Sequence, residues 1–526
     1  MSGDERSEGA PRGGIGRSTA IFALWTGVSR VAGLAREILA AAIFGTQGAI
    51  NAFVIAFQVP NLLRSLVADS ALSAAFVPVF TELQEAGRRR EAQRLAGALV
   101  GLITVGLGAI TLVAILTAPW VMPLFAPGLP DDLVDETVRL AQIMFPVVVL
   151  LGLTGLVSAI IQAAGEFGPT AFAPVLWNVV IIAALAAATP VVPAEHRISA
   201  YAGGILVGTA AQLLYLLPYL RGKGRFPLSL GLRNARVRRV LVLMLPVTLG
   251  LGLINVNLSV DAVFATLVSE EAPRAIDAAF RLYLLPQGVF SVAIATVLFP
   301  TISRLAARRD VPGMRRTVAG GLRQIVFLLL PASAFLLVLA TPVVRLVFER
   351  GEFNEQSTAF TAEALVFFAI GLVFNGASLL VIRAFFSLQL PWVPTKVAGL
   401  GVLLNLALNA ALYRPLGIGG IPLSTSITSA VTFLVLLLLL ERELGGLHGA
   451  WIVDGAVRSL AGSGGAALLG WASWRVLDDA LGRSSGAQIV SLGVAVAAAA
   501  LAYLAAARAF EMREVGLLGR LVRPLR

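Results

Sequence analysis

Long apolar stretches, each about as long as a lipid bilayer is thick, occupy most of this chain. A membrane-spanning helix needs about 20 mostly apolar residues, and charges, prolines and glycine turns separate such stretches. The second, eighth and tenth are longer than a membrane requires, so they are expected to tilt, bend or protrude. The pattern predicts an all-α integral membrane protein with about 14 transmembrane helices, at approximately 18–44, 47–83, 92–118, 136–164, 169–190, 199–220, 238–268, 274–306, 316–341, 358–388, 392–413, 419–441, 451–475 and 486–509.

The composition excludes several functional classes. Only 13% of the 526 residues are charged, against about 25% in a typical soluble protein, which excludes a soluble globular enzyme. The absence of cysteine and the presence of only two histidines exclude a disulfide framework, a thiol nucleophile and a histidine-rich metal centre. The sequence contains neither a GxxxxGK[ST] nucleotide loop nor a recognisable catalytic set, so we expect a transporter without a nucleotide or other organic cofactor.

The formal charge of +11 is best explained by membrane topology. Arginines gather in the connections that follow even-numbered stretches, whereas acids gather in odd-numbered connections. Because arginine and lysine near helix ends are retained on the cytoplasmic side, both termini are expected to be cytoplasmic. Anionic membrane lipids therefore explain the basic residues better than nucleic acid does, and these basic connections contain Arg88, Arg89, Arg90, Arg94, Arg221, Lys223, Arg225, Arg233, Arg236, Arg238, Arg239, Arg304, Arg308, Arg309, Arg315 and Arg316.

Prolines recur at related places in the two halves. Pro60 and Pro78 lie in the second stretch, and Pro286 and Pro300 lie in the eighth. The correspondence indicates two six-helix lobes around a central cavity, as in many transporters, although chance placement of prolines is an alternative. The predicted divisions are a cytoplasmic tail at 1–17, an N-lobe at 18–220, a basic cytoplasmic loop at 221–237, a C-lobe at 238–441, two added helices at 442–510 and a basic cytoplasmic tail at 511–526.

Four arginines lie inside apolar stretches, where a charge costs from about 2.5 kcal/mol upward: Arg30, Arg36, Arg64 and Arg281. Any one of these arginines could instead form a purely structural ion pair, since Glu37 adjoins Arg36 and Asp69 follows Arg64. As a group, however, the arginines outnumber nearby acids and predict a positively charged cavity formed by the first, second and eighth helices. Guanidinium groups match phosphate oxygens, so a polyphosphate head group would suit this cavity.

Two further features leave alternatives open. Arg30 and Arg36 lie about 120° apart on a straight helix, and Gly33 between them permits a kink or local unwinding, or simply close helix packing. Asp261 in the seventh helix, with Asn405 and Asn409 in the eleventh, could hold a hard cation or form hydrogen bonds between helices.

Several segments resemble one known family. SRVAGLARE at 29–37, FQVPNLLRSLVADSALSAAFVPVF after it, FRLYLLPQGVFSVAIATVLFP at 280–300, RAFFSLQ at 383–389 and LGIGGIPLSTSI at 416–427 closely resemble the MurJ/MviN family of lipid II flippases. The resemblance covers about residues 18–440. It implies a member of the multidrug/oligosaccharidyl-lipid/polysaccharide exporter superfamily in the bacterial cytoplasmic membrane. Such a protein moves lipid II, the undecaprenyl-pyrophosphate disaccharide-pentapeptide precursor of peptidoglycan, from the inner to the outer leaflet.

The resemblance also implies roles for individual residues. Arg30, Arg36, Arg64 and Arg281 match the family's functional arginines and would bind the pyrophosphate. Residues in gating or supporting positions would be Gly33, Glu37, Asn51, Asp69 and Arg383. Some family members bind sodium in the second lobe, and the corresponding ligands here would be Asp261, Asn405, Asn409 and Thr425.

The sequence departs from the family pattern at a few of these positions. Asn51, Leu390 and Asn409 stand where the family has or can have acids, and Asp69-Ser70 replaces Glu-Gly. Loss of negative charge near the arginines would weaken a gating ion pair. Loss of negative charge in the eleventh helix, at Asn409, would weaken sodium binding. The predicted mechanism is alternating access, with the last two helices forming a groove for the polyprenyl tail. The alternatives are an exporter of another polyprenyl-linked glycan or amphiphile, or a nontransporting scaffold that partners cell-wall synthesis proteins.

Overall fold

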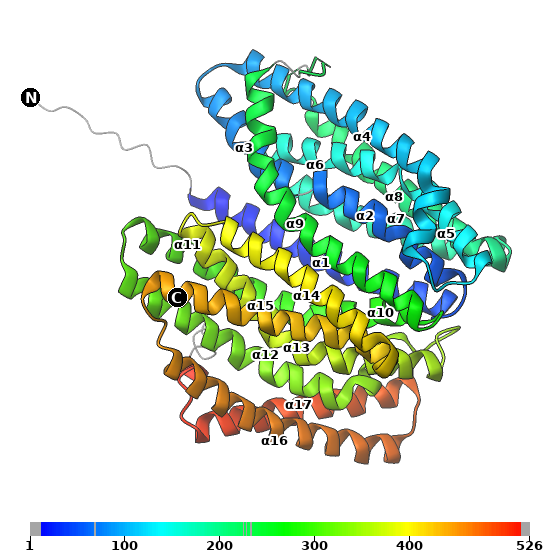
Figure 1. Ribbon diagram of the computed structural model, residues 1–526, viewed down its shortest axis with the longest axis vertical. Coiled ribbons are helices and arrows are strands. Elements are labelled where there is room, and N and C mark those ends of the chain that lie inside the picture. Colours follow the sequence, from blue (N-terminus) through cyan, green and yellow to red (C-terminus); the bar gives the residue numbers. More distant parts are fainter. Residues whose placement is uncertain (1–11, 68–69, 225, 228, 232–233, 517–526) are drawn as a thin grey trace, which may run out of the picture. The chain divides into compact units, whose positions relative to one another are not determined.

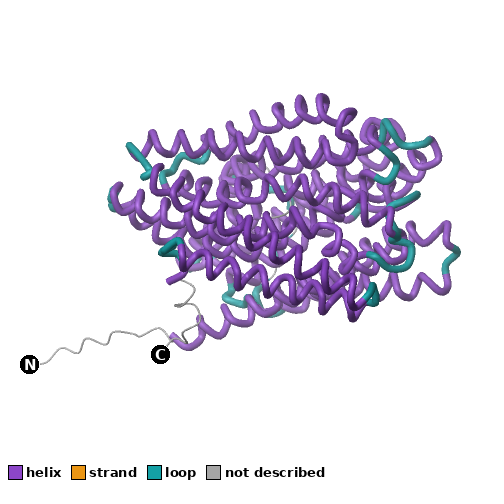
Figure 2. The backbone as a smooth tube through the Cα atoms, turned by 90° about the horizontal axis from the view of Figure 1, so that it is seen from below, coloured by secondary structure: helices purple, strands orange, loops and turns teal. Residues whose placement is uncertain are grey.

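The computed structural model describes residues 12–67, 70–224, 226–227, 229–231 and 234–516. Regular secondary structure in this part of the chain is helical throughout (Figure 2). Ten segments are long and apolar enough to cross a membrane, so the protein is a multi-pass membrane protein. The α-helices are α1 (Arg12–Phe44), α2 (Ala49–Val67), α3 (Ser70–Glu85), α4 (Arg89–Phe125), α5 (Asp131–Met144), α6 (Val147–Ala163), α7 (Gly168–Val191), α8 (Arg197–Leu216), α9 (Ala235–Val268), α10 (Ala272–Pro286), α11 (Val292–Ala307), α12 (Val311–Phe348), α13 (Glu355–Ser387), α14 (Trp392–Leu416), α15 (Gly420–Leu444), α16 (Gly449–Leu481) and α17 (Ser485–Ala509).

These helices confirm the predicted all-α membrane architecture. Most predicted stretches correspond to a single helix, and three correspond to a pair: α2 with α3, α5 with α6, and α10 with α11. The eighth stretch, expected to tilt, bend or protrude, is interrupted by the π-helical turn η3 (Gln287–Ser291), which separates α10 from α11 directly after Pro286. A proline cannot donate the intrahelical hydrogen bond, and π-turns commonly interrupt α-helices at functional sites.

One break was not predicted. The fourth stretch is divided between α5 and α6, and Pro146 stands at the N-cap of α6. Because proline lacks a backbone N–H and fixes φ near −65°, it is well suited to a helix start and poorly suited to a helix interior. The proline was therefore the signal that should have divided this stretch.

The described helices belong to two compact units. Unit 1 contains residues 1–40, 56–124 and 134–252, and unit 2 contains residues 41–55, 125–133 and 253–526. The boundaries fall within α1, α2, α4, α5 and α9 rather than in loops. The predicted lobe limits stay a prediction.

The core of unit 1 is formed by α3, α4, α6 and α9. Phe76 and Phe80 on α3 lie with their ring centroids 4.8 Å apart, and both are almost fully buried. Leucines on α4 and isoleucine on α6 complete the core, because residues three or four positions apart share one helix face. Its members include Phe76, Phe80, Leu95, Leu99 and Ile160.

In unit 2, α12, α13 and α15 pack closely, and the α16–α17 hairpin lies along α12 (Figure 1). A Cβ atom at Gly371 of α13 would come 2.6 Å from Ser426 Oγ of α15, so the missing side chain permits this close approach. The hairpin is held partly by Tyr503, whose hydroxyl donates a 2.7 Å hydrogen bond to the carbonyl of Phe327.

Candidate substrate and ion sites

Arg36 on α1 is buried in unit 1 and bonded to its neighbour. Its Nη2 lies 2.7 Å from Glu37 Oε1, and the two side chains are 10% and 5% exposed. The guanidinium also lies over the ring of Trp177 on α7, 4.6 Å from the centroid, and Trp177 Nε1 donates to Thr209 of α8. Glu37 thus compensates the charge of Arg36, and the guanidinium links α1 to α7. This arrangement agrees with the structural ion pair considered above for Arg36.

Arg30 differs from Arg36 in its surroundings. Its side chain is exposed, whereas that of Arg36 is buried, which agrees with the angle of about 120° between them. Among the described residues, Arg30 forms no ion pair. Since α1 continues as one helix through Gly33, the local unwinding suggested for this glycine is not observed.

The surroundings of Gly33 favour ordinary packing. A Cβ atom there would lie 3.7 Å from Asn178 Oδ1, which is a normal van der Waals distance. Asn178 on α7 donates to the carbonyls of Ser29 and Pro174. Of the predicted residues in this region, Arg64 belongs to α2, its side chain is outside the description, and Asp69 lies outside the described residues.

Arg281 lies on α10 in unit 2 and shares a carboxylate with Arg274. Arg281 Nε is 2.9 Å from Asp277 Oδ2, and Arg274 Nη1 is 3.0 Å from the same oxygen. The side chain of Arg281 is 35% exposed and that of Arg274 is 3% exposed. Asp277 Oδ2 therefore contacts both guanidinium groups. Sequence reasoning missed Asp277, although its position four residues before Arg281 was a usable signal.

Asn51 is fully buried in the part of α2 that belongs to unit 2. Its amide Nδ2 donates to the carbonyls of Thr46 and Gly48 at 2.8 and 3.3 Å. Its Oδ1 accepts from the backbone N–H of Arg274 in the first turn of α10 at 2.9 Å. An amide can both donate and accept, whereas a carboxylate only accepts. The departure from an acid therefore suits a neutral capping role for Asn51.

The four predicted sodium ligands come together in unit 2. Asp261 Oδ1 accepts from Asn405 Nδ2 at 2.6 Å and from Asn409 Nδ2 at 2.7 Å. Asp261 Oδ2 accepts from Thr425 Oγ1 at 2.9 Å. All four residues are at least 91% buried.

The donor set fits a hard cation. The Oδ1 atoms of Asn405 and Asn409 are buried and have no hydrogen-bond partner among the described residues. Rotating either amide by 180° would exchange its nitrogen and oxygen, so a carboxylate, two amide oxygens and a hydroxyl could face one ion. Oxygen ligands of this kind are preferred by hard cations.

Arg383 lies on α13, with its guanidinium 5.6 Å from the centroid of the Phe299 ring on α11. This contact links two helices of unit 2, and the gating role predicted for Arg383 stays a prediction. Leu390 follows in the turn before α14, where its N–H donates to the carbonyl of Phe385 at 3.0 Å.

A polar cluster that sequence reasoning missed surrounds the π-turn. Gln287 Nε2 donates to Asn375 Oδ1 at 2.5 Å, and Asn375 Nδ2 lies 3.5 Å from Ser429 Oγ. These contacts join η3 to α13 and α15. Gln287 and Asn375 are 88 positions apart in the chain, so no local pattern could have paired them.

An apolar groove of about 490 Å³ lies in unit 2 among α10, η3, α12, α16 and α17. The family resemblance implied a groove for a lipid tail beside the last two helices, and that role stays a prediction. Its walls are almost entirely hydrocarbon, which suits acyl or prenyl chains. Among its lining residues are Phe290, Phe327, Phe335, Leu336, Tyr503 and Leu504.

Comparisons with known proteins agree with these features. A sequence model of the family described as "Lipid II flippase MurJ" matches residues 40–475. The chain belongs to the MurJ lipid II flippase family. A lipid II flippase MurJ from Burkholderia cenocepacia is 33% identical over 80% of this chain and 82% of its own length. A probable lipid II flippase MurJ from Bdellovibrio bacteriovorus is 30% identical over 97% of both chains.

Solved structures support the same fold. A structure described as lipid II flippase MurJ in an inward closed conformation has a TM-score of 0.77, with 21% identity over 96% of this chain and all of its own. An inward-facing multidrug resistance MATE family transporter of the MOP superfamily has a TM-score of 0.68, with 16% identity over 80% of this chain and 95% of its own. The MurJ family and the MATE transporter therefore share this helical architecture.

Proposed function

We propose that this protein moves lipid II from the inner to the outer leaflet of the bacterial cytoplasmic membrane by alternating access. Membership of the MurJ family over residues 40–475 supports this function. The observation that carries it is an exposed arginine in a membrane helix, Arg30 on α1, which forms no ion pair among the described residues. Such charge is costly in a bilayer and marks a substrate path.

Each part of the substrate has a chemical counterpart in the chain. Guanidinium groups of Arg30, Arg64 and Arg281 would contact the pyrophosphate through forked hydrogen bonds. The apolar groove beside α16 and α17 would hold part of the undecaprenyl tail, because hydrocarbon leaves polar surroundings favourably. Arg36 has a supporting role in this scheme, since Glu37 and Trp177 already hold it.

Sodium is the proposed coupling ion. Asp261, Asn405, Asn409 and Thr425 would hold it, and the ion would neutralise the buried carboxylate of Asp261. Binding would rotate both amides and so change the contacts among α9, α14 and α15. The distribution of arginines supports cytoplasmic termini, and cell-wall synthesis proteins are proposed partners on the outer side.

Transport is tested with labelled lipid II in proteoliposomes, scored by exposure of the head group on the far leaflet. Arg30→Gln and Arg281→Gln should each lower the flipping rate by at least about tenfold, since each removes a charged contact. The matched control is Arg308→Gln, which removes an exposed arginine at the end of α11.

A depletion strain separates transport from scaffolding. A flippase with Arg30→Gln should not support growth after depletion of the host flippase, whereas a scaffold should tolerate the change. Wild-type protein that exposes no more head group than protein-free vesicles, under an imposed membrane potential, would refute the proposed function.

A further inference from the structure

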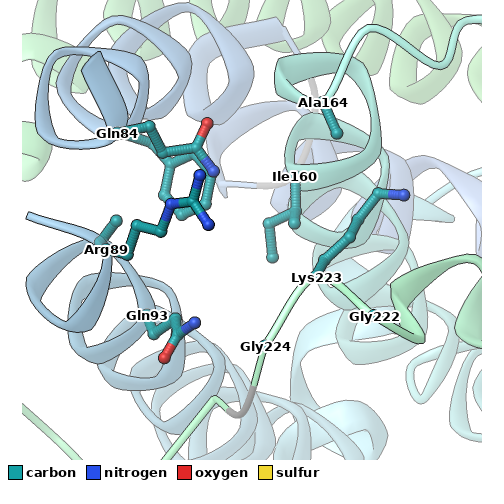
Figure 3. Close-up of a pocket in the computed structure, with 10 residues that line it drawn as sticks. Gln84, Arg89, Gln93, Ile160, Ala164, Gly222, Lys223 and Gly224 are labelled. Carbon is teal, nitrogen blue, oxygen red and sulfur yellow. The ribbon is translucent and has the colours of Figure 1, made fainter. Parts of the chain in front are cut away.

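A separate polar cavity lies within unit 1, on elements that carry none of the four intramembrane arginines. Its volume is about 330 Å³, and it is lined by α3, α4, α6 and the loop after α8 (Figure 3). Apolar side chains of α3 and α6 form part of the wall. The polar and backbone part of the wall is formed by Gln84, Arg89, Gln93, Gly222, Lys223 and Gly224.

The loop that lines this cavity is shaped by two glycines. Gly222 and Gly224 have φ angles of +81° and +113°, which side chains other than glycine rarely adopt. A Cβ atom at Gly224 would also collide with the amide of Gln93 on α4. The loop backbone can therefore lie against α4 and place Lys223, one of only two lysines in the chain, beside the cavity.

The cavity carries net positive charge. Lys223 Nζ lies 2.6 Å from Glu166 Oε1, and the lysine side chain is only 16% exposed. Arg89 has no carboxylate within ion-pair distance among the described residues. The nearby carboxylate of Glu91 is already bonded to Arg88 and Arg236. Arg89 is thus a cation at the cavity whose charge is not neutralised.

We propose that this cavity binds a phosphate group. The Arg89 guanidinium supplies a charged fork of donors, and the amides of Gln84 and Gln93 supply neutral donors beside it (Figure 3). Arg89 is also the first residue of the 37-residue helix α4, so the positive end of the helix dipole reinforces the attraction. The Lys223 side chain points away from Arg89, and Glu166 holds its ammonium group (Figure 3).

The size of the cavity selects the kind of ligand. A volume of about 330 Å³ lies at the lower end of the range of roughly 300–1,000 Å³ for small-ligand pockets. A phosphate with a glycerol unit fits this range, whereas a saccharide carrying a peptide needs more space. Bound phosphate would connect α3 and α4 to the loop after α8. Its source is either the head group of an anionic phospholipid or free phosphate.

The test uses the full-length protein in a neutral detergent and measures hydrogen–deuterium exchange with and without ligand. Dioctanoyl phosphatidylglycerol is the lipid probe, inorganic phosphate is the soluble probe, and dioctanoylglycerol is the lipid control without phosphate. Phosphate binding should slow exchange in residues 84–94 and 217–224, and dioctanoylglycerol should not. Arg89→Gln should weaken the apparent Kd by roughly tenfold, as expected for loss of a charged fork.

Arg94→Gln is the matched control, because Arg94 is an exposed arginine on the same helix that does not line the cavity. Arg89 is exposed and outside any ion pair among the described residues, so its replacement should leave folding intact. Protection by phosphatidylglycerol identifies a lipid ligand, and protection by inorganic phosphate alone identifies free phosphate. Absence of protection by both probes, or equal binding by the Arg89→Gln and Arg94→Gln variants, overturns the proposal.

Discussion

Replacing Glu514 with glutamine should loosen the C-terminal hairpin, because this carboxylate neutralises a buried arginine on α12. Arg323 Nε lies 2.5 Å from Glu514 Oε1, and Nη2 lies 3.3 Å from Oε2. The side chains of Arg323 and Glu514 are 4% and 8% exposed. Arg323 also donates to the carbonyl of Trp451 at 2.9 Å and lies over its ring, so one arginine joins α12, α16 and the segment after α17.

The contacts around Arg323 determine the expected loss. Removing one partner of a buried ion pair costs about 3–5 kcal/mol. Glutamine keeps one acceptor, and Asp454 remains 3.9 Å away with a side chain that is 45% exposed, which makes it a weak substitute worth at most about 1 kcal/mol. We therefore expect a loss of about 3 kcal/mol in hairpin docking, which corresponds to roughly 100-fold more frequent opening.

Hydrogen–deuterium exchange of the purified protein measures this opening directly. Backbone amides in residues 449–460 and 505–515 should exchange up to roughly 100-fold faster in Glu514→Gln, since exchange follows the population of the open form. Glu511→Gln is the control, because Glu511 is exposed three residues away and should leave exchange unchanged. Less than about threefold acceleration in Glu514→Gln would refute the assignment of this ion pair as the hairpin's anchor.

Three other changes test the remaining sites. Asp261→Asn should abolish the thermal stabilisation that sodium gives over potassium. That stabilisation is about 2.7 kcal/mol at a sodium concentration of 100 times the Kd. An equal response to sodium in the wild-type protein and the variant would contradict the ion site. Asn51→Asp should lower the melting temperature, because a carboxylate cannot donate a hydrogen bond to the Thr46 carbonyl. The buried carbonyl is then left without a donor, which costs about 1–3 kcal/mol. An unchanged melting temperature would contradict the capping role. Arg36→Gln should destabilise the protein by up to about 3–5 kcal/mol by breaking the buried pair with Glu37, and adding Glu37→Gln should recover much of that loss. A double variant as unstable as the sum of both single variants would exclude the coupling.

Hydropathy was sufficient for the helices because a bilayer imposes one rule on the whole chain. Backbone polar groups in hydrocarbon must bond within the segment, so an apolar stretch of sufficient length becomes a helix. The same rule explains the missed break at Pro146, since hydropathy continues through a residue that interrupts hydrogen bonding. Backbone chemistry, rather than apolarity, determined where that stretch was divided.

Side-chain partners were harder to predict than helices. Asp261, Asn405 and Asn409 were grouped as polar residues of apolar helices, but only the family resemblance added Thr425, because Asp261 on α9 lies 144 to 164 positions from its partners on α14 and α15. Trp177 beside Arg36 and Asn375 beside Gln287 had no comparable signal, because helix packing brings them together. By contrast, Asp277 and Arg281 are one helical turn apart, and a search for i, i+4 pairs would have found them.

The positions of the carboxylates determine which intramembrane arginines are the better candidates for binding the lipid pyrophosphate. A charge in the membrane attracts an anion only to the extent that protein carboxylates leave it uncompensated. Arg36 and Glu37 together are neutral and buried, so Arg36 supports the packing of α1 against α7. Arg30 is exposed, and Arg281 shares one carboxylate with Arg274. The lipid pyrophosphate should therefore depend more on Arg30 than on Arg36, and an equal functional role for all intramembrane arginines does not follow from their common position in apolar helices.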